Sequence, residues 1–329
     1  MSKLRRRRMG ARAGPTLAVV DLGSNNCRLL IARPGANGNL HIVDSFSRVV
    51  RLGEGVAATG MLSDAAIVRT LAALAICAQH IRDSGAGYVR AIATAAARGA
   101  RNAGVLLARA KAEAGIDLEV VSEEEEARLA AVGCAPLIGS RYEGALVFDI
   151  GGGSTEIIWM RRDAGVAETL FSSSTPVGVV TLAEGAAAMD SASFDAMRAR
   201  MIARFAQVRQ KMDAVRAFSR DEHHLLGTSG TVTTLAAIAM GLGRYIRYRV
   251  DASWHDSEDI LKVVEKLIGL DHAGRAAIGV IGQDRADLVL PGCAIFAAIH
   301  ALWPCAQLRV ADRGLREGML RELMLQASA

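Results

Sequence analysis

Two short segments carry the residue types best suited to chemistry on a charged ligand. Residues 18–32 (AVVDLGSNNCRLLIA) and 146–160 (LVFDIGGGSTEIIWM) repeat one pattern, in which Asp21 matches Asp149 and a turn of small residues follows each aspartate. Tight turns without bulky side chains expose backbone N–H groups, and such groups form concave anion sites. Both segments therefore indicate a site for an anion, with phosphate as the leading candidate.

A third loop of the same kind lies at residues 227–231 (GTSGT), where an apolar run leads into a helical pattern. Backbone N–H groups at a helix start bind phosphate, and hydroxyl or amide side chains add hydrogen bonds. An isolated Asp-x-Gly turn is usually structural, but its repetition with small polar residues favours a binding site. The predicted phosphate-binding residues of the three loops are Gly23, Ser24, Asn25, Gly151, Gly152, Gly153, Ser154, Thr155, Ser229, Gly230 and Thr231.

A divalent cation is expected beside these loops. Asp21 and Asp149 each end the first strand of a repeat, so their negative charges would repel a bound phosphate unless a cation lay between them. Carboxylate oxygens are the ligands that hard divalent cations prefer. We therefore predict Mg²⁺ or Mn²⁺ as the cofactor.

Each repeat predicts a strand, a turn and a second strand. A helix would have to follow the glycines in a dinucleotide-binding or Walker loop, but the run TEIIW after the second turn favours a strand. After the first repeat we predict a strand at 40–51, a helix at 63–83, a strand at 87–94, a helix at 103–114 and a strand at 117–121. After the second repeat we predict a strand at 167–173, helices within 191–218 and a strand at 224–227. The predicted fold class is α/β, with two lobes related by duplication whose glycine turns face each other across an active-site cleft.

The chain length supports two lobes, because 329 residues correspond to about two domains. We expect a disordered basic tail at residues 1–14, an N-terminal lobe at 15–135 and a C-terminal lobe at 136–329. The boundary is placed where Pro136 and Gly139 interrupt the apolar pattern. The last helix, at 315–326, is free to pack across either lobe.

Composition excludes several functional classes. Of the 39 Lys and Arg residues, six lie in the first dozen positions, so the net charge of +5 belongs to the tail and argues against a nucleic-acid partner. The five cysteines form no C-x-x-C pair, which favours a reducing cytoplasm. We expect no signal peptide and no membrane span, because the apolar segment 288–308 is interrupted by His300, Pro304 and Gln307 and is typical of a buried helix.

Several stretches resemble, in order, the motifs of one enzyme family. They are DLGSNNCRLLIAR (21–33), AIATAAARGARNA (91–103), EVVSEEEEARL (119–129), FDIGGGSTEIIW (148–159) and LLGTSGTVTTLAA (225–237). They are similar to the exopolyphosphatase and guanosine pentaphosphate phosphohydrolase family over almost the whole chain after residue 16. The resemblance implies the actin-like (ribonuclease H-like) architecture of sugar kinases, in its short two-domain form.

The resemblance identifies Glu126 as the catalytic base that accepts a proton from water. Crowding by neighbouring acids near a cleft would raise the pKa of this carboxyl, which suits a base. The alternative is structural, since the four glutamates at 123–126 would also stabilise a helix start capped by Ser122.

The same resemblance implies roles for further residues. Arg98 matches a substrate-facing arginine, and its planar guanidinium can bind two phosphoryl oxygens at once. Asn102 matches a companion phosphate-binding residue. Asp149 and Glu156 match an acidic pair that binds the divalent ion, and Asp21 is a third candidate, acting through a water molecule.

The sequence thus predicts an exopolyphosphatase that releases terminal orthophosphate from inorganic polyphosphate by metal-assisted in-line attack of water. A guanosine pentaphosphate phosphohydrolase and a non-catalytic sensor that binds this nucleotide remain open. A kinase of the same architecture would need an acceptor for the phosphoryl group, and a homodimer is compatible with all of these functions.

Overall fold

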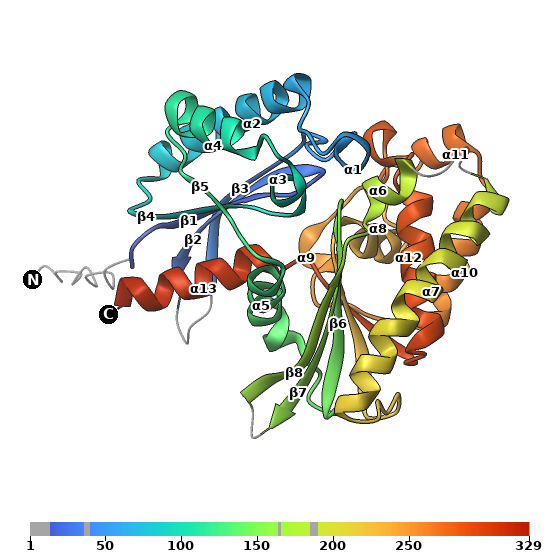
Figure 1. Cartoon of the computed structure of the whole chain (residues 1–329). Coiled ribbons are helices and arrows are strands. Elements are labelled where there is room, and N and C mark those ends of the chain that lie inside the picture. The colour runs from blue at the N-terminus through green and yellow to red at the C-terminus, as the bar shows by residue number, and fades with distance from the viewer. Residues whose placement is uncertain (1–13, 36–39, 164–165, 185–189, 329) are drawn as a thin grey trace, which may run out of the picture.

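The computed structural model describes residues 14–35, 40–163, 166–184 and 190–328. Two lobes form the molecule, each built around one mixed β-sheet with helices packed against it (Figure 1). The predicted disordered tail at residues 1–14 lies outside the described residues, apart from Gly14.

The N-terminal sheet has the strand order β3-β2-β1-β4-β5. The first three strands run antiparallel, whereas β4 and β5 continue the sheet parallel to β1. Partly buried and exposed residues alternate along β3, which is the edge strand, and none of its residues is fully buried. The strands are β1 (Leu17–Leu22), β2 (Asn26–Pro34), β3 (Leu40–Val49), β4 (Tyr88–Ala93) and β5 (Leu118–Val120).

The C-terminal sheet repeats this order as β8-β7-β6-β9-β11 and adds β10 beside β11. Its first three strands are again antiparallel, and β9 and β11 again run parallel to the first strand. The strands are β6 (Gly144–Ile150), β7 (Thr155–Asp163), β8 (Val166–Thr175), β9 (His223–Thr228), β10 (Trp254–Asp256) and β11 (Gln307–Ala311). This match confirms the predicted fold class of two duplicated α/β lobes.

Helices of the N-terminal lobe cover one face of its sheet. The long helix α2 (Asp64–Ser84) begins where the Ser63 hydroxyl accepts a hydrogen bond from Ala66 N–H, and it ends at Gly85 in the left-handed conformation. By length and composition alone α2 could cross a membrane, but its apolar residues pack in the core of the lobe. The other helices are α1 (Val56–Thr59), α3 (Ala95–Gly99) and α4 (Ala103–Arg109), which continues into a π-helical turn (Ala110–Ala114).

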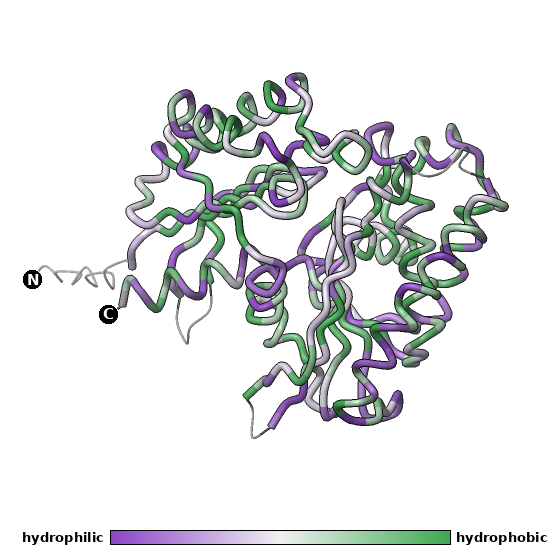
Figure 2. The backbone as a smooth tube through the Cα atoms, viewed as in Figure 1, coloured by the Kyte–Doolittle hydropathy of each residue, from purple (hydrophilic) through white to green (hydrophobic). Residues whose placement is uncertain are grey.

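The C-terminal lobe holds the larger core. Helix α12 (Val289–Leu302) is buried along most of its length, as the apolar pattern predicted, although residues from Gln307 onward form β11. In Figure 2 the hydrophobic stretches of α12 and α8 lie inside the lobe. The remaining helices are α6 (Val179–Glu184), α7 (Ser191–Val215), α8 (Gly230–Ala239), α9 (Arg247–Val250), α10 (Ser257–Ile268) and α11 (His272–Ala276).

Two helices cross between the lobes. Helix α5 (Glu123–Cys134) precedes the predicted boundary, yet its apolar face belongs to the core of the C-terminal sheet. Conversely, the last helix α13 (Leu315–Ser328) packs against β1 of the N-terminal sheet. At the crossing Gly133 lies against Gly314, and Gly318 lies against the backbone of Leu129, so no side chain separates the two segments.

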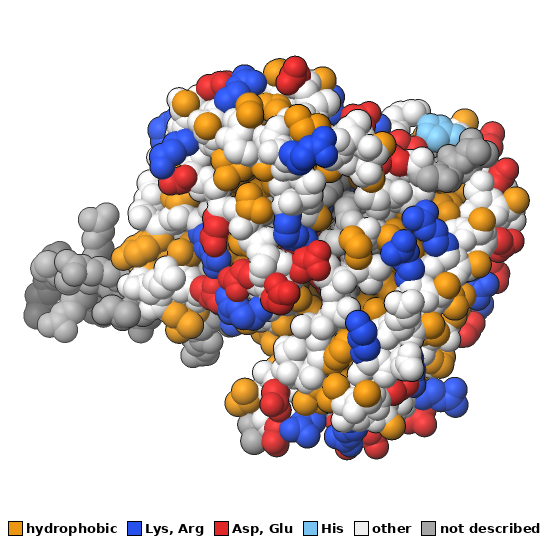
Figure 3. All heavy atoms as spheres, in the orientation of Figure 1, with side chains coloured by type: hydrophobic (Ala, Val, Ile, Leu, Met, Phe, Trp, Pro, Cys, Tyr) orange, Lys and Arg blue, Asp and Glu red, His pale blue; other side chains and the backbone are white. Residues whose placement is uncertain are grey.

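Ion pairs reinforce this crossing. Arg90 of β4 pairs with Glu125 of α5 at 3.1 Å and with Glu322 of α13 at 2.9 Å. Arg128 of α5 pairs with the same two glutamates. Figure 3 shows acidic and basic side chains gathered over this part of the surface. The network joins both crossing helices to the N-terminal sheet.

Candidate active site

The glycine turns that follow β1 and β6 are in direct contact. A Cβ on Gly153 would lie 2.6 Å from the Ser24 Oγ, and one on Gly152 would lie 3.0 Å from the Ser24 Cβ. Only glycine permits so close an approach, so the composition of the second turn follows from its packing against the first. The structure therefore brings together the two loops that the sequence repeat singled out.

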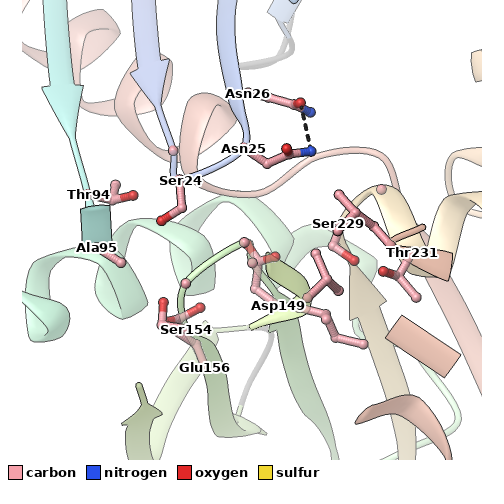
Figure 4. A pocket seen from close by; sticks show the side chains of 18 of the residues that line it. Ser24, Asn25, Asn26, Thr94, Ala95, Asp149, Ser154, Glu156, Ser229 and Thr231 are labelled. Carbon is pink, nitrogen blue, oxygen red and sulfur yellow. Dashed lines mark hydrogen bonds between the residues drawn. The ribbon is translucent and has the colours of Figure 1, made fainter. Parts of the chain in front are cut away.

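A cavity of about 140 Å³ opens where these turns meet, and four loops from both lobes line it (Figure 4). Besides the turns after β1 and β6, the loops after β4 and β9 contribute Thr94, Ala95 and Ser229. The predicted site residues in its lining are Asp21, Gly23, Ser24, Asn25, Glu126, Asp149, Gly151, Gly152, Gly153, Ser154, Glu156, Ser229, Gly230 and Thr231.

The backbone of both turns is arranged to bind an anion. Carbonyl groups of the first turn accept hydrogen bonds from residues 50–53, and those of the second from residues 179–181. The N–H groups of Ser24, Asn25, Gly152 and Gly153 have no such partner within the described part of the chain. Oriented, unpaired N–H groups beside a cavity are what a phosphate requires.

The third loop ends in the N-terminus of α8. Ser229 has a φ of 112°, which is unfavourable for a residue with a side chain, and its hydroxyl accepts a hydrogen bond from Val232 N–H. The strained backbone directs the first turn of α8 at the cavity, to which Gly230 and Thr231 contribute. A helix N-terminus in this position favours an anion.

Four carboxyl groups line the cavity, those of Asp21, Glu126, Asp149 and Glu156. Burial raises the pKa of Asp149 to about 6, and it also raises the pKa of Asp21 and, more strongly, of Glu156. The Ser174 hydroxyl donates to Glu156 at 3.0 Å. Desolvated carboxylates this close together are costly to ionise, so a cation bound among them would be strongly favoured.

Glu126 lies in the first turn of α5, which Ser122 caps by accepting a hydrogen bond from Glu125 N–H. Burial raises the pKa of Glu126 to about 7, against the opposing effect of Arg98, whose Nη1 donates to the carboxylate at 3.1 Å. The same nitrogen also donates to the Val121 carbonyl at 2.9 Å. The capped helix start and the cavity position of Glu126 thus occur together, and the two interpretations do not exclude each other.

Three predicted site residues do not reach the cavity. Arg98 lies outside its lining and contacts Glu126 instead. Both ends of the Asn102 amide bind the backbone of Leu62, and the Thr155 hydroxyl donates to the Val177 carbonyl at 2.7 Å. Since their hydrogen-bonding groups are already engaged, Asn102 and Thr155 hold loops in place, and we do not retain them as phosphate ligands.

The donor set fits a partly hydrated divalent ion. Within the described ranges no group of three or more His, Cys, Asp or Glu side chains is spaced to bind a metal on its own. Mg²⁺ is usually held by one or two carboxylates together with water and substrate phosphates. Asp149 and Glu156 face each other across the β6–β7 ladder, and the Asn25 Oδ1 nearby is buried without a hydrogen-bond partner.

Sequence reasoning missed two arginines of this region. Arg28 lines the cavity from β2, and Arg285 lines it from a 3-10 turn (Gln283–Arg285) of the other lobe. A signal existed for Arg28, because it stands opposite Asp21 in its hairpin just as Glu156 stands opposite Asp149. No local pattern marks Arg285.

Comparison with known proteins agrees with this geometry. A model of the Ppx/GppA phosphatase family matches residues 30–327. Exopolyphosphatase 2 of Mycobacterium tuberculosis is 35% identical over 290 residues, which span 85% of this chain and 88% of that protein. The crystal structure of an Aquifex aeolicus member of the Ppx/GppA family has 28% identity and a TM-score of 0.77, covering 96% of this chain and 99% of the other.

An exopolyphosphatase from Cytophaga hutchinsonii, at 24% identity, shares the fold with a TM-score of 0.83, over 94% of this chain and 98% of that chain. Three findings identify the family of this chain: the sequence match over most of its length, the matching architecture and the cavity built from both lobes. The chain belongs to the Ppx/GppA phosphatase family.

Proposed function

We propose that this protein is an exopolyphosphatase, which releases terminal orthophosphate from inorganic polyphosphate. One observation carries the proposal. Glu126, a carboxyl group with a pKa near neutrality, lines the same cavity as anion-binding loops from both lobes. A base and a phosphate cradle in one enclosed space are the elements needed to direct water at a bound phosphoryl group.

The residues divide the reaction among them. The turn N–H groups and the α8 N-terminus hold the terminal phosphoryl group, while Glu126 orients a water molecule in line and accepts its proton at a carboxylate oxygen. Arg98 acts as a positioning residue, because it donates a hydrogen bond to that carboxylate from outside the cavity. Asp149 and Glu156, with Asp21 through a water molecule, would hold Mg²⁺, which when bound neutralises charge on the phosphate oxygens.

A polar groove supports a polymeric substrate. A second cavity of about 540 Å³ adjoins the first, with Arg28 and Arg285 in the lining of both. Three more arginines line this groove, namely Arg247, Arg313 and Arg316. Arg247 and Arg313 are paired with acids, so a chain of phosphates in the groove would meet chiefly the guanidinium groups of Arg28, Arg285 and Arg316. The relative from M. tuberculosis is named an exopolyphosphatase.

Guanosine pentaphosphate is the second candidate substrate. Beside the third loop the cavity has an apolar wall formed by Leu235, Leu288, Val289 and Cys293. Such a wall would suit a nucleobase better than a phosphate. The same enclosed space therefore supports the nucleotide as an alternative.

A phosphate-release assay tests the proposal. Purified protein is incubated with long polyphosphate, tripolyphosphate, guanosine pentaphosphate or ATP, each with and without Mg²⁺. We expect orthophosphate from long polyphosphate, only with Mg²⁺ and without any second substrate, which separates a hydrolase from a kinase. Release from guanosine pentaphosphate alone would favour the second candidate, and binding without any release would support the sensor and overturn the proposal.

A further inference from the structure

A segment that follows β3 supports the first phosphate turn on its carbonyl side. We name this segment, residues 50–55, the strap. The N–H groups of its first two residues both donate to the Asn25 carbonyl, at 2.8 and 3.0 Å. Gly53 N–H donates to the Ser24 carbonyl at 2.8 Å, and a Cβ on Gly53 would lie 2.9 Å from the Ser24 Cβ. The strap therefore determines where the N–H groups of this turn point.

The beginning of the strap is fixed to the opposite lobe. Arg51 has a φ of 47°, in the left-handed region that residues with a side chain rarely adopt. In this conformation its N–H binds the first turn, while its side chain pairs with Asp287 of the C-terminal lobe at 3.3 Å. Its Nη2 also donates to the Asp284 carbonyl at 3.4 Å. One residue thus contacts both the first turn and the other lobe.

Helix α6 supports the second phosphate turn in the same way. Val179 N–H donates to the Gly151 carbonyl at 3.0 Å. Val180 N–H donates to the Gly152 carbonyl at 2.8 Å. The preceding residue, Gly178, has no room for a side chain, because a Cβ there would lie 2.4 Å from the Gly151 carbonyl oxygen. The position of α6 therefore sets the position of the second turn.

One hydrogen bond joins the two supports. Glu184, the last residue of α6, accepts at Oε1 from Gly55 N–H, at the end of the strap, over 2.7 Å. Figure 1 shows α6 beside α1, whose N-cap is Gly55. Glu184 is exposed, and within the described part of the chain it forms no ion pair, so a backbone N–H is the partner of its carboxylate. Hydrogen bonds to a charged acceptor are stronger than those between neutral groups.

From this arrangement we propose that Glu184 is a positioning residue for the phosphate site. Its bond to Gly55 joins the segment that supports the first turn to the helix that supports the second. Arg51 fixes the beginning of the strap, and Glu184 fixes its end, so both sets of turn N–H groups are held at the spacing that one terminal phosphoryl group requires. The proposal rests on the proposed function only in the choice of a phosphate chain as the ligand.

Two competing explanations give this hydrogen bond no role. In the first, the turns set their own spacing, because a Cβ on Gly153 would already lie 2.6 Å from the Ser24 Oγ, and loss of Glu184 changes nothing. In the second, the negative charge of Glu184 repels the phosphate chain, and its removal tightens binding. Glutamine separates these explanations from the proposal, since its amide keeps an acceptor oxygen but carries no charge.

The test measures phosphate binding without turnover. Isothermal titration calorimetry follows tripolyphosphate and orthophosphate binding to the full chain carrying Glu126→Gln, which prevents turnover, at one fixed Mg²⁺ concentration. Glu184→Ala and Glu184→Gln are added to this chain one at a time. Glu168→Ala is the matched control, because Glu168 is an exposed glutamate of the same lobe that pairs with Arg161 and lines neither cavity described. Thermal melting verifies that each variant is folded.

We expect Glu184→Ala to raise the Kd of both ligands by the same factor, about three- to tenfold, since both place a terminal phosphoryl group on the turns. Glu184→Gln should recover most of this affinity, and the control should not change it. Unchanged or tighter binding by the alanine variant, or a loss that glutamine does not recover, would overturn the proposal.

Activity of chains that retain Glu126 separates this result from the proposed function. There Glu184→Ala should lower kcat/KM for polyphosphate by about the same factor and leave the pH profile of kcat unchanged, because the base is not altered. The expected binding losses in a protein that releases no orthophosphate would retain the positioning role and reject the hydrolase. Hydrolysis with a kcat/KM unaffected by Glu184→Ala would retain the hydrolase and reject the positioning role.

Discussion

The two β-hairpins have the same backbone arrangement, but the residues at one equivalent position, Arg28 and Glu156, carry opposite charges. In the first, Asp21 pairs across the ladder with Arg28; in the second, Asp149 pairs in the same register with Glu156. Directly opposed residues lie on the same face of a sheet. The first hairpin therefore presents an acid with a base to the cleft, and the second presents two acids.

The turns of the two hairpins, by contrast, are alike. In each, backbone carbonyls are bound by the segment that follows the third strand, which leaves N–H groups directed at the cavity. The comparison shows how a duplicated unit can divide its tasks. In the proposed site the backbone of both copies would bind anions, while one side chain per copy, Arg28 or Glu156, would add a positive charge for phosphate or a carboxylate for a cation.

The largest expected effect comes from removing the base that faces the second hairpin. Glu126→Gln should lower kcat on polyphosphate by on the order of 10² to 10⁴, with little change in KM, because proton acceptance is lost while binding groups remain. Steady-state kinetics measure this, and Glu124→Gln is the control, since Glu124 is exposed on the same helix. Near wild-type turnover of the Glu126 variant would show that Glu126 is not the base.

The second hairpin is expected to determine the metal requirement. Glu156→Gln should raise the Mg²⁺ concentration for half-maximal activity by roughly 10- to 100-fold, because the amide keeps one oxygen but lacks the negative charge that attracts the cation. Arg28→Gln, at the equivalent position of the first hairpin, should raise KM for polyphosphate without this shift. Titration of activity with Mg²⁺ checks both, and equal shifts in the two variants would erase the distinction between the hairpins.

Acidic pH should lower kcat by protonating Glu126. A carboxyl group accepts a proton only when ionised, and the pKa of Glu126 is raised to about 7, so kcat should fall below that pH by about tenfold per unit. A pH profile of kcat measures it; a flat profile between pH 5 and 8 is incompatible with a base of this kind.

The smallest effect concerns the turns themselves. A Cβ on Gly151 would lie 2.9 Å from the Ser154 carbonyl oxygen, whereas one on the equivalent Gly23 would lie 3.7 Å from its nearest neighbour. Gly151→Ala should therefore destabilise the fold by about 1–3 kcal/mol, and Gly23→Ala by less than about 1 kcal/mol. Thermal or urea unfolding compares the two variants, and equal losses would show that the turns are packed alike.

Sequence reasoning succeeded where the signal was local and repeated. The hairpins were predictable because their strand and turn residues follow one another directly, and duplication then implied that the turns of residues 23–25 and 151–154 face each other. The domain boundary was harder, since α5 precedes residue 135 but packs in the second core. Strands β10 and β11 were not predicted, because β10 has only three residues and β11 begins at the end of the apolar segment 288–308.

The site was predictable only in part, because contacts between segments far apart in the sequence decide where some of its side chains lie. Arg285 reaches the cavity through a contact between lobes, and nothing near it in sequence records that contact. Asn102 has the right residue type, but its amide is held by Leu62, forty residues away. Residue type thus identifies what a side chain can bind, whereas long-range packing decides what it does bind.

The crossing of α5 and α13 has a further consequence for the timing of catalysis. Helix α5 packs with the C-terminal sheet but is tied to β4 by Arg90, so any parting of the lobes would act on the contact between Glu126 and Arg98, which lies on α3 of the other lobe. An open molecule would hold a carboxylate without its guanidinium partner. In the proposed reaction, water activation would then depend on a closed arrangement of the two lobes.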